Sequence, residues 1–134
     1  NKVGKPVSNS SNLIITFSND FYKFYYALSL ASTLKATGKD VSIFISGYAC
    51  HFIKKNWIDY DKESINEKLK KKKMGSIEEM FAYCKELEVE IFYCESAIEF
   101  LNINTKEITN LVSIKPKSMY SVLNSYKQGE IIFI

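Results

Sequence analysis

The feature that most constrains the fold is an alternation of short apolar runs with longer amphipathic segments. Residues 13–17 form a continuous, β-branched run typical of a strand buried on both faces. Residues 21–37 place apolar side chains at helical spacing, with capping residues at 18–20 before them and Gly38 after them. Residues 40–45 read as a second strand. Two strands joined by a helix through short loops predict a βαβ unit with parallel pairing.

The same alternation continues to the end of the chain. Ser76 and Glu79 have the spacing of a capping box before a helix whose apolar stripe includes Cys84, which we therefore expect to be buried. The elements expected after it are a strand at 89–94, a short helix that opens at 95–97 and stops near Asn102, and a capped turn at 104–107. A strand at 111–114, a helix from Pro116 to Gly129 and a strand at 130–134 follow. In that last helix the inner face is predicted to be Met119, Val122, Leu123 and Tyr126.

These elements predict one α/β domain at residues 12–134, after a disordered tail at residues 1–11. The expected fold is a three-layer α/β/α sandwich with a mostly parallel five-stranded sheet, of flavodoxin-like type. Residues 48–57 could hold a helical turn or two, and the polar residues 59–73 are expected to form a surface insertion.

Composition excludes several classes of protein. No apolar run approaches the roughly 20 residues that span a bilayer, and residues 1–11 contain no apolar core of a signal peptide. Three cysteines, an odd number, do not suggest a disulfide framework, so a reducing cytoplasm is the expected compartment. With one histidine and no CxxC, neither a zinc site nor another metal or cofactor is predicted.

The positive charge is concentrated in one place. The net charge is +3, and residues 68–73 contain five lysines, so the rest of the chain carries −2. Nucleic-acid binding usually requires basic residues spread over a face, and we therefore expect no nucleic-acid partner. The lysine run is predicted to be a mobile, solvated segment that could steer an acidic partner protein.

The candidate site follows from the predicted sheet, because ligands of such folds bind at the carboxyl ends of the strands. Cys94 ends one strand and precedes a short helix, whose free N–H groups favour an anionic sulfur. It is the candidate catalytic residue, and we expect it to be at least partly exposed in a crevice that Cys50 and His51 could line. The alternative is a small apolar residue that closes a strand. The candidate substrate-binding residues come from three loops at the same edge: Asn19, Asp20, Cys50, His51, Glu95 and Ser96.

Other chemistries find less support. No GxGxxG or GxxxxGK[ST] motif is present, and the first strand lacks the acidic cluster of a phosphorylated receiver domain. His51 is the only histidine and no nucleophile elbow accompanies it, so a partly buried polar residue near a loop is the alternative to a catalytic histidine. Glu95 works against a thiolate at Cys94 unless its side chain turns to solvent.

The chain resembles the DsrE/DsrF-like sulfur-transfer family, and most closely its DsrE2-type branch, over residues 13–134. The matching segments are residues 12–20 with the Ala-rich helix after them, 37–44, 73–75, 93–96 followed by 101–103, and 129–134. The chain departs from the family in having residues 114–117 where a Gly-rich segment is usual, and in the loop at residues 47–51.

This resemblance implies a protein that relays persulfide sulfur on Cys94 between donor and acceptor proteins. It also implies association into trimers or hexamers, and exposed aromatic residues such as Tyr22, Tyr26 and Tyr48 independently favour a homo-oligomer. One alternative is a non-catalytic assembly or binding subunit, in which Cys94 is structural. Another is a peroxiredoxin-like thiol redox protein, in which Cys50 would be the resolving thiol.

Overall fold

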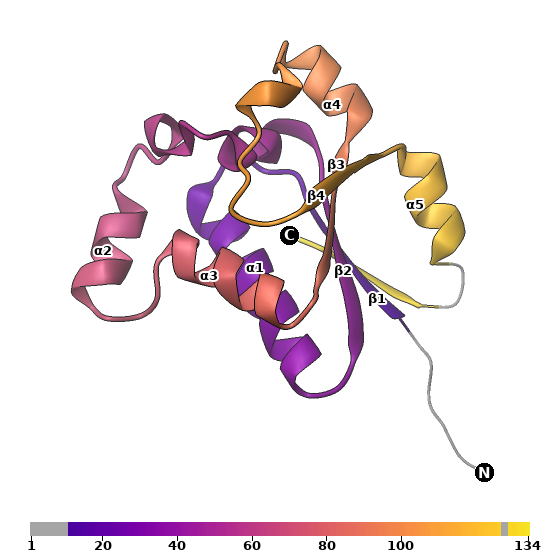
Figure 1. Ribbon diagram of the computed structural model, residues 1–134, viewed down its shortest axis with the longest axis horizontal. Coiled ribbons are helices and arrows are strands. Elements are labelled where there is room, and N and C mark those ends of the chain that lie inside the picture. Colours follow the sequence, from indigo (N-terminus) through magenta and orange to yellow (C-terminus); the bar gives the residue numbers. More distant parts are fainter. Residues whose placement is uncertain (1–10, 127–128) are drawn as a thin grey trace.

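The computed structural model describes residues 11–126 and 129–134 and shows a parallel five-stranded sheet flanked by helices (Figure 1). The strand order is β4-β3-β2-β1-β5, and all four neighbouring pairs are parallel. The predicted α/β sandwich is therefore confirmed. The strands are β1 (Ser11–Thr16), β2 (Asp40–Ile45), β3 (Glu90–Cys94), β4 (Ile114–Lys117) and β5 (Glu130–Phe133).

The order of the strands explains which face each helix covers. From β1 to β4 the chain moves in one direction across the sheet, so right-handed crossovers place α1 (Phe21–Ala36) and α3 (Ile77–Glu86) on one face. The connection from β4 to β5 runs back past β1, and its helix α5 (Met119–Ser125) lies on the opposite face (Figure 1). The shorter helices are α2 (Ile65–Lys71), α4 (Glu95–Phe100) and the 3₁₀ helices η1 (Gly47–Ile53), η2 (Trp57–Tyr60) and η3 (Thr105–Glu107).

The core lies between the sheet and α1, α3 and η1. The bulkiest side chains there are fully buried, and they include Phe24, Phe44, Phe52 and Phe81. Phe24 contacts both Phe52 and Phe81, with ring centroids 5.4 and 6.0 Å apart. Cys84 lies among them on the inner stripe of α3, fully buried as predicted. This packing fixes η1 against α1 and so positions the loops at the carboxyl edge of the sheet.

The predicted helix caps are present. The Asp20 carboxylate accepts a hydrogen bond from the Lys23 N–H at the start of α1. Ser76 and Glu79 form a reciprocal capping box at α3, and Asn104 and Glu107 form another at η3. These local interactions use neighbouring residues only, which is why sequence spacing reveals them.

The fourth strand and the last helix differ from the prediction. β4 begins at Ile114, where the predicted strand ended, and Pro116 lies inside it. Proline is tolerated there because β4 is an edge strand, so a missing N–H breaks no ladder on its outer side. Helix α5 instead begins after Ser118, whose hydroxyl caps it, and ends at Ser125 rather than at Gly129. Of its predicted inner face only Val122 is fully buried, whereas Met119 and Leu123 are exposed.

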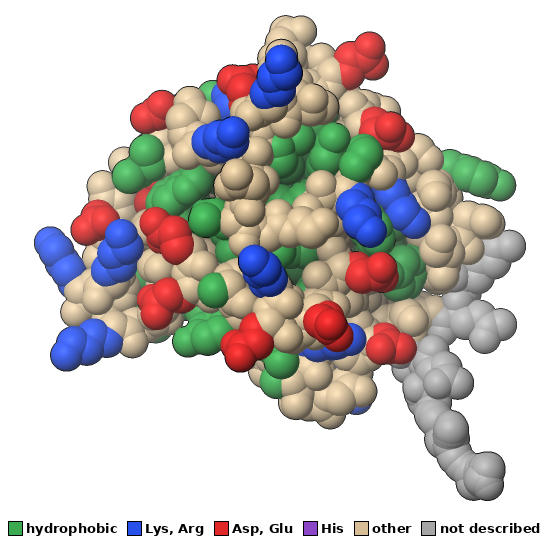
Figure 2. All heavy atoms as spheres, in the orientation of Figure 1, with side chains coloured by type: hydrophobic (Ala, Val, Ile, Leu, Met, Phe, Trp, Pro, Cys, Tyr) green, Lys and Arg blue, Asp and Glu red, His purple; other side chains and the backbone are tan. Residues whose placement is uncertain are grey.

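The lysine-rich segment is also more ordered than predicted. Residues 65–71 form α2, and Leu69 anchors this helix by burying its side chain. The Asp61 carboxylate accepts hydrogen bonds from the Ile65 and Asn66 N–H groups at 2.8 and 2.9 Å, and these bonds stabilise the start of the helix. The lysines themselves are exposed, and in Figure 2 lysine side chains project from the left edge of the molecule, where Figure 1 places α2. The sequence pattern missed the helix because it contains only one buried apolar side chain in seven residues.

Two further predictions concern the ends of the chain and the membrane. Ser11, placed in the predicted tail, begins β1, and the rest of that tail lies outside the described residues. None of the helices within residues 11–126 and 129–134 has both the length and the hydropathy that crossing a bilayer requires.

Candidate functional site

The carboxyl ends of β1, β2 and β3 meet at one edge of the sheet, and the predicted site residues all follow these ends. β1 leads to Asn19 and Asp20, β2 leads into η1, and β3 ends at Cys94, directly before α4. η1 packs against α1, β3 and α4, so the three loops form one continuous region. Within this region the structure separates an open pocket from a buried pair of cysteines.

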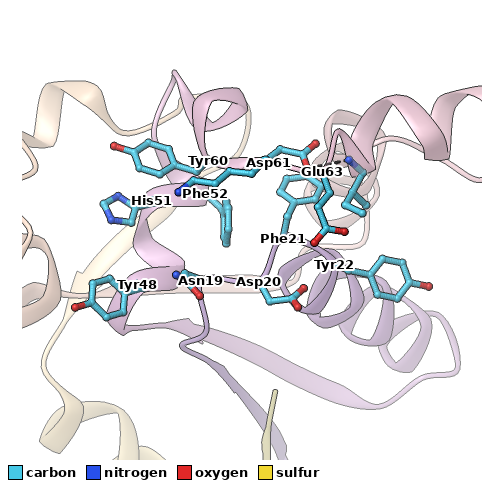
Figure 3. A pocket seen from close by; sticks show the side chains of 12 residues that line it. Asn19, Asp20, Phe21, Tyr22, Tyr48, His51, Phe52, Tyr60, Asp61 and Glu63 are labelled. Carbon is cyan, nitrogen blue, oxygen red and sulfur yellow. Dashed lines mark hydrogen bonds between the residues drawn. The ribbon is translucent and has the colours of Figure 1, made fainter.

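The open pocket has a volume of about 520 Å³ and lies between the start of α1, η1 and the segment after η2 (Figure 3). Asn19, Asp20 and His51 of the predicted site line it together. Phe21 and Phe52 close its inner side, with ring centroids 5.4 Å apart in an edge-on contact. The remaining lining residues are Tyr22, Tyr48, Tyr60, Asp61, Lys62, Glu63 and Ile65.

His51 is held between aromatic rings rather than by polar partners. Its ring stacks on the Tyr60 ring, with centroids 4.2 Å apart and an angle of 9° between the planes. The Tyr48 ring also stacks on it, with a centroid distance of 6.2 Å. Its Nδ1 is buried and has no hydrogen-bond partner among the described residues. Burial, and then the charge of Lys54, lower the pKa of His51. The imidazole is therefore neutral near pH 7 and has no carboxylate to orient it, which disfavours a catalytic triad.

Three carboxylates line the same pocket, and their roles differ. Asp61 is buried and both its oxygens accept backbone N–H bonds of α2. Asp20 caps α1 through one oxygen, and Glu63 is exposed. Neither Asp20 nor Glu63 forms an ion pair within the described part of the chain. The salt bridge found there joins Lys70 and Glu67. Asp20 and Glu63 thus keep acceptor capacity that faces the pocket.

Cys94 does not lie in this pocket, and its expected exposure is wrong. Only 4% of its surface is accessible, because α4 and η1 pack over the end of β3. It is the N-cap residue of α4 and its side chain makes no capping hydrogen bond. The sequence places Cys94 at the correct edge of the sheet, but the cover over it depends on contacts between distant segments.

Cys50 lies on the buried side of η1 and is a neighbour of Cys94. Its thiol is completely buried and donates a weak hydrogen bond to the Ile45 carbonyl at 3.6 Å. Burial, and to a smaller extent the nearby Cys94 thiol, raise the pKa of Cys50 to about 12, although a hydrogen bond from the Cys94 backbone opposes the shift. Burial alone raises the pKa of Cys84 to about 12. Both thiols are therefore protonated and unreactive at neutral pH.

Glu95 and Ser96 are the remaining predicted residues, and they line neither the pocket nor a cavity with Cys94. Both side chains are exposed on the first turn of α4. The structure thus brings Asn19, Asp20 and His51 together, packs Cys50 near Cys94, and leaves Glu95 and Ser96 at the surface.

Sequence reasoning missed the outer wall of the pocket. Tyr60, Asp61 and Glu63 follow η2, and they reach the site because Trp57 of η2 stacks on Phe21 of α1 at 5.6 Å. The polar-aromatic sequence at residues 59–61 was visible, but nothing local indicates that it folds back onto α1. Within the described residues, no three His, Cys, Asp or Glu side chains are grouped to hold a metal ion.

Comparison with known proteins defines the relationship of this chain. The sequence profile of the DsrE/DsrF-like family matches residues 13–133. The chain belongs to the DsrE/DsrF-like family. No curated protein matches it.

Solved structures show that this DsrE/DsrF-like chain has the fold of its relatives. It is similar to the ychN protein of E. coli, with a TM-score of 0.68 and 11% identity over 93% of this chain and 99% of that one. A conserved protein of unknown function from Bacteroides thetaiotaomicron gives a TM-score of 0.60 and 18% identity over 92% of this chain and 95% of its own. A protein of unknown function from Methanobacterium thermoautotrophicum gives a TM-score of 0.58 and 10% identity over 93% of this chain and 99% of its own. At such identities the likeness shows the fold alone.

Proposed function

We propose that this DsrE/DsrF-like protein is a sulfur carrier that relays persulfide sulfur on Cys94 between donor and acceptor proteins. The observation that carries the proposal is a difference among the three cysteines. Cys50 and Cys84 have no accessible surface and pKa values of about 12, whereas Cys94 lies at the carboxyl edge of the sheet and retains a small accessible surface. Family membership supports the same chemistry.

The transfer is a thiol exchange and needs no cofactor. The Cys94 thiolate attacks the outer sulfur of a donor persulfide, a sulfur–sulfur bond forms on Cys94, and the donor leaves as a thiolate. An acceptor thiolate then attacks the outer sulfur of the Cys94 persulfide, and Cys94 leaves as a thiolate. No net oxidation occurs. Glu95 is exposed to solvent, so its charge is screened and opposes the thiolate less than a buried carboxylate would.

A donor must first reach the buried sulfur. Cys94 is covered by α4, which has only six residues and buries only Ala97 and Ile98. Short elements with few buried side chains open locally at lower free energy than the core. We propose that α4 moves when a donor protein docks, which would protect the persulfide between the two transfers.

The direct test is mass spectrometry of the protein after incubation with a persulfide donor, followed by removal of the excess donor. We expect the peptide containing Cys94 to carry one additional sulfur atom. Cys94→Ser should abolish this gain while its circular dichroism and unfolding midpoint stay close to those of the wild type, because Ser is nearly isosteric with Cys.

Cys84→Ala is the control, since it removes a fully buried thiol from α3. It should load sulfur normally if it remains folded. Loading of Cys94→Ser to the level of the wild type, or loading on Cys84, would contradict the proposal.

The second candidate is a non-catalytic subunit of an oligomer, and the burial of Cys94 favours it. Apolar side chains are exposed around the edge strand β5, where Phe17 and Phe133 pack edge-on at 6.4 Å and both are more than half exposed. Such a surface is typical of an interface. We propose a homo-oligomer, a trimer or hexamer, that uses this surface. Light scattering should show the oligomer, and Phe133→Ser should weaken it; a wild-type monomer at micromolar concentration would contradict this assembly.

Three finer assignments complete the proposal. The segments that resemble the family, residues 93–96 and 101–103 among them, favour its DsrE2-type branch. All three cysteines are free thiols, which suits a reducing cytoplasm. A peroxiredoxin-like redox role is disfavoured, because Cys50, its required resolving thiol, is fully buried with a pKa of about 12.

A further inference from the structure

The pocket at His51 is separate from Cys94. It is open to solvent on one side, and Cys94 and Cys50 do not line it. Three carboxylates and one ammonium, that of Lys62, line it, and the neutral His51 adds no charge. The Lys54 ammonium lies beside the pocket, 5.1 Å from the centre of the Tyr60 ring, so one negative charge remains in excess. A hollow with this surplus of negative charge favours a cation.

The walls of the pocket add a second feature that suits an organic cation. Tyr22 and Tyr48 are each about half exposed, 49% and 51%, although both line a concave surface. Figure 3 shows their rings on opposite sides of Asn19 and Asp20. The faces of aromatic rings attract ammonium and guanidinium groups and pack well against their apolar carriers. Tyr25 stacks on Tyr22 with centroids 5.7 Å apart and supports the orientation of its ring.

Two carboxylates are available to a ligand. Asp61 is occupied by two backbone N–H groups, which leaves Asp20 and Glu63. Asp20 uses only Oδ1 to cap α1. In Figure 3 the Glu63 side chain extends from the wall that follows η2 toward the side of the pocket where Asp20 lies. A cation placed between them would neutralise both, and charge-assisted hydrogen bonds of this kind are the stronger ones.

We propose that this pocket binds an ammonium or guanidinium group carried on an apolar or flat body. The group would contact Asp20 and Glu63, and the body would pack against the exposed tyrosine rings. The source is either a free small amine or the basic side chain of a partner protein. This inference does not depend on sulfur transfer, because no residue of the pocket takes part in that step.

The single tryptophan provides a readout. Trp57 stacks on Phe21, which lines the pocket, so a bound ligand should change its fluorescence. Three probes of similar size separate charge from shape: 2-phenylethylammonium, neutral 2-phenylethanol and anionic 3-phenylpropionate. We expect the ammonium to bind at least about tenfold more tightly than the alcohol, and the anion not to bind.

Variants locate the binding. Asp20→Asn keeps the helix cap, since Asn caps as well as Asp, and Glu63→Gln keeps the shape of an exposed side chain. Each should weaken binding of the ammonium about tenfold, and the double variant more. Glu86→Gln is the matched control, because it removes an exposed carboxylate at the end of α3, outside the pocket.

Two acetylated tripeptides, Gly-Arg-Gly and Gly-Lys-Gly, test the source of the cation. Binding of a peptide but not of the free amine would assign the site to a basic side chain of a partner, and the reverse would assign it to a small amine. The proposal is overturned if no cationic probe binds at millimolar concentration, if the alcohol binds as tightly as the ammonium, or if Glu86→Gln weakens binding as much as the two pocket variants. Because persulfide loading is measured separately on Cys94, failure of this site leaves the sulfur-carrier proposal intact, and the reverse also holds.

Discussion

The pocket at His51 and the cysteine pair lie side by side at one edge of the sheet but differ in almost every physical property. The pocket is open, carries surplus negative charge and is walled by half-exposed rings. Cys50, on the inner side of η1, and Cys94, at the start of α4, are almost without accessible surface. One region is accessible but has no reactive nucleophile, whereas the other contains thiols but is closed.

This difference suggests that the pocket would serve binding, whereas the cysteines would serve the proposed chemistry. The pocket and the outer surface of α4 are accessible without any rearrangement, whereas the proposed sulfur transfer would require α4 to move. η1 joins the two regions, because His51 and Phe52 line the pocket while Cys50, in the same helix, contacts the Cys94 backbone.

The largest effect is expected at Phe52, which belongs to the core beneath both regions. Its ring is almost completely buried and packs against Phe21 and Phe24, each with centroids 5.4 Å away. Phe52→Ala should lower the free energy of unfolding by about 3–5 kcal/mol, because it leaves a cavity. Urea unfolding measures this. Tyr48→Ala, in the same helix but half exposed, should cost less than about 1 kcal/mol, and equal losses would mean that η1 is not anchored through its inner face.

A smaller effect is expected from pH at His51. The groups facing it are Lys54, Tyr48 and Tyr60, and burial followed by the Lys54 charge lowers its pKa in the folded state. The unfolded chain then binds more protons below about pH 6.5, so stability is complete above that pH and falls as the pH drops toward the folded pKa. His51→Phe keeps the stacking and should flatten this part of the stability profile. A profile unchanged by the substitution would show that His51 is already solvated.

The smallest effect is expected in the lysine run. Replacing Lys70–Lys73 with serine removes exposed side chains and one exposed ion pair between Lys70 and Glu67. The unfolding free energy should change by less than about 1 kcal/mol. Leu69→Ala, one residue before, should cost about 2–3 kcal/mol because that side chain is buried. A large loss from the serine variant would mean that the lysines pack against the domain.

The sequence predicted the fold because strand and helix periodicities are local. The order of elements, the burial of Cys84 and the capping boxes all follow from residues a few positions apart. Pro116 was misplaced because its tolerance depends on β4 being an edge strand, which is a property of the whole sheet. α2 was missed because its order comes from Asp61 and one buried leucine rather than from a stripe.

The site was predicted only in part, for the same reason. Parallel strands carry Asn19, Asp20, His51 and Cys94 to one edge, as their places in the chain require. Which of them share a pocket depends on η2 folding back onto α1 and on α4 covering the end of β3, and both are contacts between distant segments. Cys94 was therefore located correctly along the sheet but expected in an open crevice.

The central claim, that Cys94 is the reactive thiol beneath a movable cover, is tested most directly by its rate of alkylation in the native protein. Iodoacetamide at neutral pH, followed by mass spectrometry of each cysteine-containing peptide, gives the rates of Cys94 and Cys84 in the same sample. We expect Cys94 to be modified much faster and with little dependence on low urea, because only α4 needs to open, whereas Cys84 should react at the rate of global unfolding. Equal rates with the same urea dependence would show that Cys94 is closed off as firmly as the core, and would contradict the sulfur-carrier account.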